Sequence, residues 1–141
     1  MDKITIRQPV MVKFIVTEQT KQLIVRELQQ AITNVGVELD QLEFHAKRAL
    51  EEAKKQGLHA VEAVQQQIES ERKARLERRE QLMAHLTQIQ QAELGSELPH
   101  GQVETTIEVK VGDSWEDIMR GGEIVLKDGI VHEIRRVGGA H

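Results

Sequence analysis

The sequence predicts an α+β protein in which a long coiled-coil helical stretch is mounted on a small four-stranded β domain. Residues 18–94 contain no proline and are rich in Glu, Gln, Lys, Arg, Ala and Leu, which are strong helix formers. An alternating strand pattern precedes this stretch, and further strand patterns follow it. We expect the N-terminal strand and the C-terminal strands to pair in one sheet.

The N-terminal segment, residues 1–17, is expected to form a strand over residues 3–16. Its apolar side chains alternate onto one face at a period of two: Val10, Val12, Phe14 and Val16. Pro9 cannot donate a hydrogen bond to a neighbouring strand, so an edge position or a break is expected there. Thr17 is the expected N-cap of the helix that follows.

The helical stretch carries apolar residues at steps of three and four, the heptad spacing of a coiled coil. The first half of this seam runs through Val25, Leu28, Ile32, Val35, Leu39, Leu42, Ala46, Ala49 and Ala53. Gly57 lies near the midpoint of the stretch, and the apolar spacing resumes after it. Gly95, with Pro99 soon after it, predicts that the helix stops at Leu94.

A distance argument favours a fold-back at Gly57. A straight helix over residues 18–94 would be about 115 Å long and would separate strands that are unstable alone. A bend near Gly57 gives an antiparallel helical hairpin and returns the chain to its start. The alternative is a straight helix in an antiparallel dimer, in which each sheet mixes strands from two chains.

The C-terminal β segment is expected over residues 95–137, with a first strand from Gly101. A short helix over residues 114–120 follows, opened by a capping box at Ser114. Two more strands flank Asp128-Gly129, the strongest short hairpin signal. The tail, residues 138–141, is expected to fray.

Composition narrows the classes of function. The chain has no cysteine, which excludes disulfides and thiolate metal sites, and its net charge is −4. No apolar run approaches the roughly 20 residues of a membrane span, and the first residues lack a signal-peptide core. Six histidines show no spacing typical of metal ligands. We therefore expect a cytoplasmic protein without a metal site, a cofactor or a membrane anchor.

Two features invite a functional interpretation. The densest charge run could track a nucleic-acid backbone, or it could be a solvated face with the pairs Glu69–Lys73 and Glu71–Arg75. Its basic members are Arg72, Lys73, Arg75, Arg78 and Arg79. Trp115, the only tryptophan, could cover the sheet as part of its core, or it could anchor a partner.

No nucleophile–base motif and no phosphate-binding loop are present, so no catalytic residue is assigned and we do not expect an enzyme. The leading hypothesis is a non-enzymatic interaction or scaffold protein that self-associates through its coiled coil, with a dimer favoured. The alternative is an RNA- or ribosome-associated factor that uses Arg72 to Arg79. An enzyme would need a pocket near Trp115.

The last 48 residues also resemble a known family. The segments that carry the resemblance are Leu94–Leu98, Gly101–Glu104, Val109–Asp113 and Glu123–Arg135, and they look like the YlqD-like family of small bacterial proteins. The order of strand, long helix and strands matches along nearly the whole chain. The resemblance implies a cytoplasmic bacterial protein. It implies no activity, cofactor or site residue.

Overall fold

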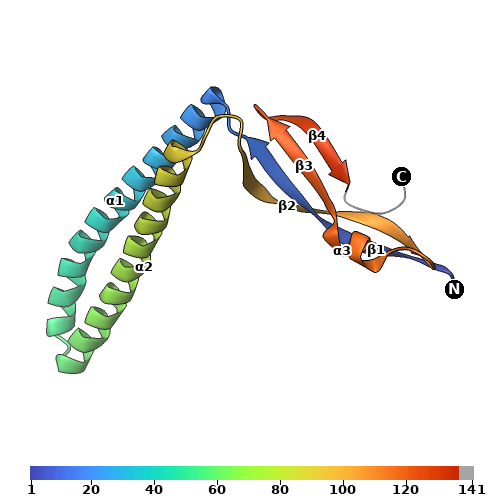
Figure 1. The fold of residues 1–141 in the computed structure, drawn as a ribbon. Coiled ribbons are helices and arrows are strands. Elements are labelled where there is room, and N and C mark those ends of the chain that lie inside the picture. Colours follow the sequence, from blue (N-terminus) through green and yellow to red (C-terminus); the bar gives the residue numbers. More distant parts are fainter. Residues whose placement is uncertain (137–141) are drawn as a thin grey trace. The chain divides into compact units, whose positions relative to one another are not determined.

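The computed structural model describes residues 1–136. In chain order its elements are β1 (Lys3–Ile15), α1 (Glu18–Lys54), α2 (Leu58–Gln91), β2 (Glu97–Lys110), α3 (Trp115–Arg120), β3 (Gly122–Lys127) and β4 (Ile130–Arg136) (Figure 1). They form two compact units: residues 22–91 are a helical unit, and residues 1–21 with the chain from Ala92 onward are a β unit. The fold is α+β, as predicted. The expected tail, residues 138–141, lies outside the described residues.

In the helical unit, α1 and α2 of one chain run antiparallel, side by side (Figure 1). Arg72 and Arg78 of α2 form ion pairs with Glu43 and Glu38 of α1, so residue numbers fall along α1 as they rise along α2. Gly57, between the helices, has a φ of 117°, which glycine adopts readily. The predicted hairpin is confirmed, and the straight-helix alternative is wrong.

The hairpin has a thin aliphatic core. Its buried residues follow steps of four and seven on α1 and lie three heptads apart on α2: Leu28, Val35, Leu42, Ala46, Ala53, Ile68 and Ile89. Ala49 lies on the predicted seam but is exposed. α2 ends at Gln91, three residues before the predicted stop. Few side chains are therefore fully buried along helices of 37 and 34 residues.

In the β unit the strand order is β2-β1-β3-β4 (Figure 1). β1 runs antiparallel to β2 and parallel to β3, and β4 runs antiparallel to β3. Pro9 pairs with Glu104 of β2, and β1 pairs with β3 only from Val10 onward. Pro9 therefore lies where β1 has a single neighbour, in line with the expected edge position.

β2 differs from the prediction because it begins at Glu97 and includes Pro99. β2 is an outermost strand, where the missing N–H of a proline is tolerated. The register with β1 shifts at this point: Gly101 pairs with Val12, and Pro99 pairs with Lys13. His100 is thus the extra residue of a bulge, which lets pairing continue past the proline.

Local caps and turns form where the sequence predicts them. The Thr20 amide donates to Thr17 Oγ1 at 3.1 Å, so Thr17 caps α1. Ser114 caps α3. The turn between β3 and β4 places Asp128 at φ 51° and Gly129 at φ 80°, both in the left-handed region that a two-residue hairpin turn requires.

The core of the β unit is small. Its buried residues come from β1, the chain after it, α3 and β3: Val10, Val12, Val16, Ile118 and Val125. Gln8 Nε2 donates to the Ile118 carbonyl at 2.6 Å and ties α3 to β1. Gly121 ends α3 at φ 72°, where a Cβ would collide with the Pro9 carbonyl oxygen. Only glycine, which has no Cβ, fits where the backbone of Gly121 passes so close to that of Pro9.

Candidate functional site

The arginine-rich part of α2 is the first candidate site. Arg72 Nε donates to Glu43 of α1 at 2.7 Å, and its Nη1 donates to Glu69. Arg78 Nη2 donates to Glu38 of α1 at 2.9 Å. Lys73 lies 4.0 Å from Glu77. Three of the five basic side chains proposed to contact nucleic acid therefore face carboxylates.

The other two basic residues of the run occupy a different environment. Arg75 and Arg79 are partly buried, at positions where the helical spacing of α2 would otherwise place apolar residues. Arg75 Nη1 donates to the Glu71 backbone carbonyl at 3.1 Å. The apolar stems of such side chains can cover a core while their charged ends reach solvent. The run thus contributes to the packing of the hairpin.

The ion pairs differ from those expected. Neither Glu69–Lys73 nor a Glu71–Arg75 carboxylate pair forms in the described chain; the pairs are Arg72–Glu69 and Lys73–Glu77. The hydrogen bond from Arg72 holds the pKa of Glu43 below its ordinary value. The same bond raises the pKa of Arg72. Arg72, Lys73 and Arg78 are thus each paired with an acidic side chain.

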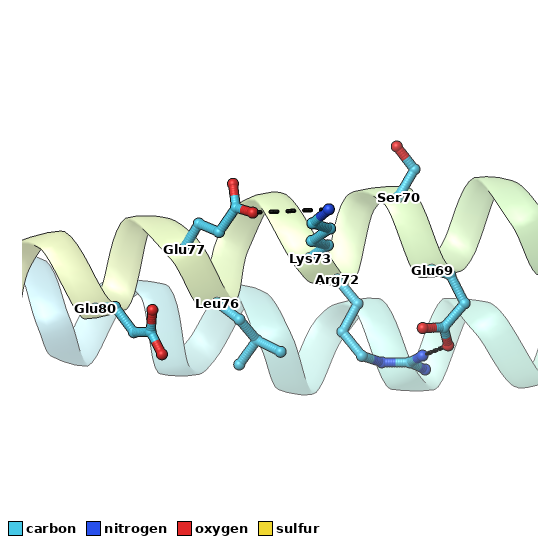
Figure 2. Close-up of a pocket in the computed structure, with 7 residues that line it drawn as sticks. All are labelled: Glu69, Ser70, Arg72, Lys73, Leu76, Glu77 and Glu80. Carbon is cyan, nitrogen blue, oxygen red and sulfur yellow. Dashed lines mark hydrogen bonds and ion pairs between the residues drawn. The ribbon is translucent and has the colours of Figure 1, made fainter.

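An open groove of about 520 Å³ runs along the same part of α2 (Figure 2). Its lining contains acidic and basic side chains around one exposed leucine: Glu69, Ser70, Arg72, Lys73, Leu76, Glu77 and Glu80. Leu76 is 37% exposed. Acidic side chains outnumber basic ones, so the lining does not concentrate positive charge for a phosphate backbone.

Trp115 is the second candidate site, and the expectation that it packs as a core residue is wrong. It is the first residue of α3 and is 62% exposed, whereas Ile118 of the same helix is 5% exposed. Met119, one turn further on, is 58% exposed, and Val111 before the helix is 84% exposed.

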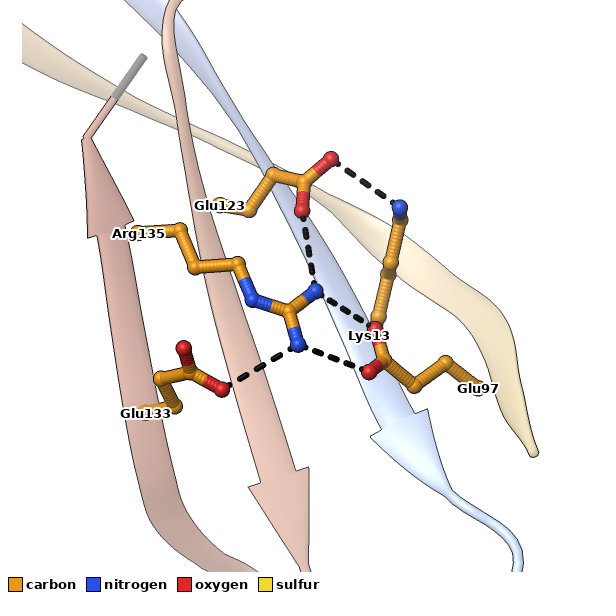
Figure 3. A network of polar contacts seen from close by, with 5 residues as sticks. All are labelled: Lys13, Glu97, Glu123, Glu133 and Arg135. Atoms are coloured by element: carbon orange, nitrogen blue, oxygen red, sulfur yellow. Dashed lines mark hydrogen bonds and ion pairs between the residues drawn. The ribbon is translucent and has the colours of Figure 1, made fainter. Parts of the chain in front are cut away.

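A polar network on the sheet was not predicted from the sequence (Figure 3). Arg135 of β4 makes two hydrogen bonds to Glu97, at 2.7 and 2.8 Å, and further ones to Glu133 and Glu123 at 3.1 and 3.4 Å. Lys13 of β1 lies 2.9 Å from Glu123. Residues from all four strands thus meet in one cluster of three carboxylates and two cations.

The network shifts the titration of its members. Hydrogen bonds from Arg135 lower the pKa of Glu97, and those from Lys13 and Arg135 lower the pKa of Glu123. The pKa of Arg135 is raised by its hydrogen bonds to Glu97 and Glu133. These charged side chains bind one another across the four strands, so few of their hydrogen-bonding groups remain for a ligand. The sequence does show opposite charges on these strands, and paired strand positions share a face of the sheet. Only the strand register, however, shows which of these charges meet.

A smaller polar contact lies within the β unit at the first turn of α1. Asp128 Oδ1 accepts hydrogen bonds from Thr17 Oγ1 at 2.5 Å and from Thr20 Oγ1 at 3.0 Å. The hydrogen bond from Thr17 is the largest cause of a lowered pKa at Asp128. A carboxylate at a helix N-terminus is favourable, because the helix dipole is positive there.

Two further features, metal ligands and membrane-spanning helices, concern residues 1–136. No three histidine or acidic side chains converge in this range as metal ligands would. Neither long helix in this range has a stretch apolar enough to cross a bilayer.

The comparisons with known proteins agree with one another. The family model for YlqD protein matches residues 4–135. The uncharacterized protein YlqD of Bacillus subtilis (strain 168) is 27% identical over 122 residues, which cover 86% of this chain and 91% of that protein. A crystal structure of a protein of unknown function from Synechococcus sp. WH 8102 has a TM-score of 0.83 and 27% identity, and covers 94% of this chain and 95% of its own. This chain belongs to the YlqD family.

Proposed function

We propose that this chain is a non-enzymatic scaffold protein that self-associates through its helical hairpin and uses Trp115 to anchor a protein partner. The observation that carries the proposal is the number of large apolar side chains on the outside of the hairpin. They are 37 to 72% exposed: Leu23, Val37, Phe44, Leu58, Leu76 and Met83. Thin cores often depend on oligomerisation for stability, which favours association between copies.

The surface for a different partner is the patch formed by Val111, Trp115 and Met119. Tryptophan is enriched among residues that dominate binding energy, because its large rigid ring loses little conformational entropy. Three acidic residues lie close to Trp115 in the sequence: Asp113, Glu116 and Asp117. A partner with an apolar pocket and a basic rim fits this chemistry.

Sedimentation equilibrium of the full chain tests self-association. We expect an average mass above that of the monomer by about 100 μM, with a concentration dependence that defines a dissociation constant. A monomer throughout that range contradicts self-association.

A quantitative pull-down from a bacterial host tests the partner surface. The wild-type chain is compared with Trp115→Ser, and Val131→Ser, at an exposed position of β4, is the matched control. We expect a protein to be retained by the wild type and by Val131→Ser but lost with Trp115→Ser. Equal retention by all three contradicts a role for Trp115.

The alternative function is an RNA- or ribosome-associated factor that uses Arg72, Lys73, Arg75, Arg78 and Arg79. The neutralised pairs described above make this the weaker proposal. Its test is fluorescence anisotropy with single-stranded RNA at about 50 and 200 mM salt. Binding that weakens steeply with salt, and that Arg78→Gln reduces further, would favour RNA. If the chain binds no RNA at the lower salt concentration, the RNA proposal is contradicted and the scaffold proposal remains.

A cytoplasmic location is part of the scaffold proposal. A chain with no cysteine gains nothing from an oxidising compartment.

A further inference from the structure

The side of α1 turned away from α2 carries apolar residues at heptad spacing. Val37 and Phe44 each follow a buried residue, Val35 and Leu42, by two positions, which is about 200° around the helix. Leu23 lies two heptads before Val37. The exposed fractions of Leu23, Val37 and Phe44 are 50, 49 and 61%. With Gln30, these residues form what we call the outer stripe of α1.

The outer stripe matches itself when two copies of α1 lie antiparallel. With Leu23 opposite Phe44 of the partner subunit, Gln30 lies opposite Val37 of the partner subunit. The two-fold axis then passes between Thr33 and Asn34. Both ends of the contact pair an aliphatic residue with an aromatic one.

The charges beside the outer stripe are complementary in this register. Arg26 and Asp40 each follow a stripe residue by three positions, so Arg26 faces Asp40 of the partner subunit, and symmetry repeats the pair. Both side chains are exposed. Neither makes an ion pair with another residue of the described chain, residues 1–136. Opposite charges that face across an interface favour one register over others.

Two registers shifted towards the C-terminal end of α1 bring like charges together. Shifting the contact so that Val37 meets its own copy sets Leu23 against Glu51 and Arg26 against Lys47. Shifting further, so that Val37 meets Phe44, sets Asp40 against its own copy. Like charges that face each other are repulsive. In the register with Leu23 opposite Phe44, the apolar pairs at both ends and the Arg26–Asp40 pairs occur together.

We propose that two copies of this chain associate through the outer stripes of α1, antiparallel, with Leu23 of each against Phe44 of the partner subunit. This rests on the proposed self-association and names its surface and register. Gln30 is the polar residue of the contact, and a polar residue in a helical seam weakens association while it specifies register. The dimer is therefore reversible.

Charge exchange tests the register by sedimentation equilibrium. Arg26→Asp and Asp40→Arg should each raise the dissociation constant by about three- to tenfold, since each turns two attractive contacts into repulsive ones. The dissociation constant of the double variant should be within about twofold of the wild-type value, because the pair is restored with its charges exchanged. Gln30→Leu should tighten association by about tenfold, since it completes the apolar stripe.

Spin labels give an independent reading in the cysteine-free chain. A label at position 33, near the two-fold axis, should give an intermolecular distance below about 25 Å. A label at position 48 should give about 44 Å, from the helical rise. A dimer that gives neither distance, and whose dissociation constant does not change in the charge-exchange variants, overturns the outer-stripe contact. Self-association itself would still hold. A monomer at all concentrations overturns both.

Discussion

Arg72 Nε donates a hydrogen bond to Glu43 Oε1 at 2.7 Å across 29 residues of sequence. The two residues lie on α2 and α1, so this contact sets the helices against each other in a defined antiparallel register. It also keeps Glu43 ionised to lower pH than an isolated carboxyl, because it lowers the pKa of that group. The same combination of a long-range contact and a lowered pKa occurs at Glu97, Glu123 and Asp128.

The first prediction concerns acid. All four of these carboxyl groups have a pKa that folding lowers, so the unfolded chain binds protons at a higher pH than the folded one. Their stabilisation is therefore complete above the unfolded pKa values and is lost as pH falls below them through the lower folded values. Urea midpoints measured by circular dichroism should fall across this window.

Replacing Arg135 by Gln provides the control for the acid prediction. The pKa of Glu97, followed by carboxyl NMR, should rise towards its ordinary value, since Arg135 is the main cause of its shift. The pKa of Glu43, in the other unit, should stay where it is. An unchanged Glu97 would contradict the network of Figure 3.

The second prediction compares two glycines with positive φ. Gly121→Ala should lower the free energy of unfolding by more than about 2 kcal/mol, because the new Cβ would meet the Pro9 carbonyl oxygen. At Gly129 an added Cβ would have no neighbour within 4 Å, so Gly129→Ala should cost only the backbone strain, about 1 kcal/mol. Chemical denaturation measures both. Equal losses would contradict the close approach at Pro9.

The third prediction uses the single tryptophan. Trp115 is 62% exposed, so the emission maximum of the folded chain should be close to that of the chain in concentrated urea. An added quencher such as acrylamide should reach the indole almost equally well in both states. A strongly blue-shifted folded spectrum at concentrations where the chain is monomeric would show that Trp115 is buried.

The fourth prediction compares two valines of the β unit. Val125 is fully buried, so Val125→Ala should lower the free energy of unfolding by about 1.5–3 kcal/mol. Val131 is 54% exposed, and Val131→Ala should change the free energy of unfolding by no more than about 0.5 kcal/mol. Urea titrations of both variants measure these free energies. Similar values would place the sheet core elsewhere.

Local signals in the sequence located the ends of most elements, because caps and turns depend on a few adjacent residues. Thr17, Ser114 and Asp128-Gly129 each formed the predicted cap or turn. The start of β2 was missed because Pro99 usually argues against a strand, and only its outermost place in the sheet makes it tolerable.

The sites were harder to predict than the fold, because they depend on contacts between distant parts of the chain. Trp115 is 62% exposed while Ile118, three positions further along α3, is buried, and no local pattern distinguishes the two. The Arg135 network needs the register of four strands at once. The arginines of α2 were recognised as a basic run, but their partners Glu38 and Glu43 became visible only with the hairpin.

The fifth prediction concerns the turn of that hairpin. Gly57 has a φ of 117°, so Gly57→Ala should destabilise the chain by about 1 kcal/mol or more, since alanine resists this conformation. Gly36 lies inside α1 with nothing within 4 Å of an added Cβ. Gly36→Ala should therefore stabilise by roughly 0.5–1 kcal/mol, because alanine is the better helix former. Thermal melts should show opposite signs.

The pairing of α1 with α2 of the same chain is the relationship on which the whole fold depends, and dipolar spectroscopy measures it directly. Spin labels on cysteines at positions 27 and 85 should lie within about 25 Å of each other in a sample diluted with unlabelled protein. In a single straight helix the same positions would be about 87 Å apart. A short distance that survives dilution is the predicted result. A short distance that disappears on dilution would mean that the helices pair between chains, and it would contradict the hairpin.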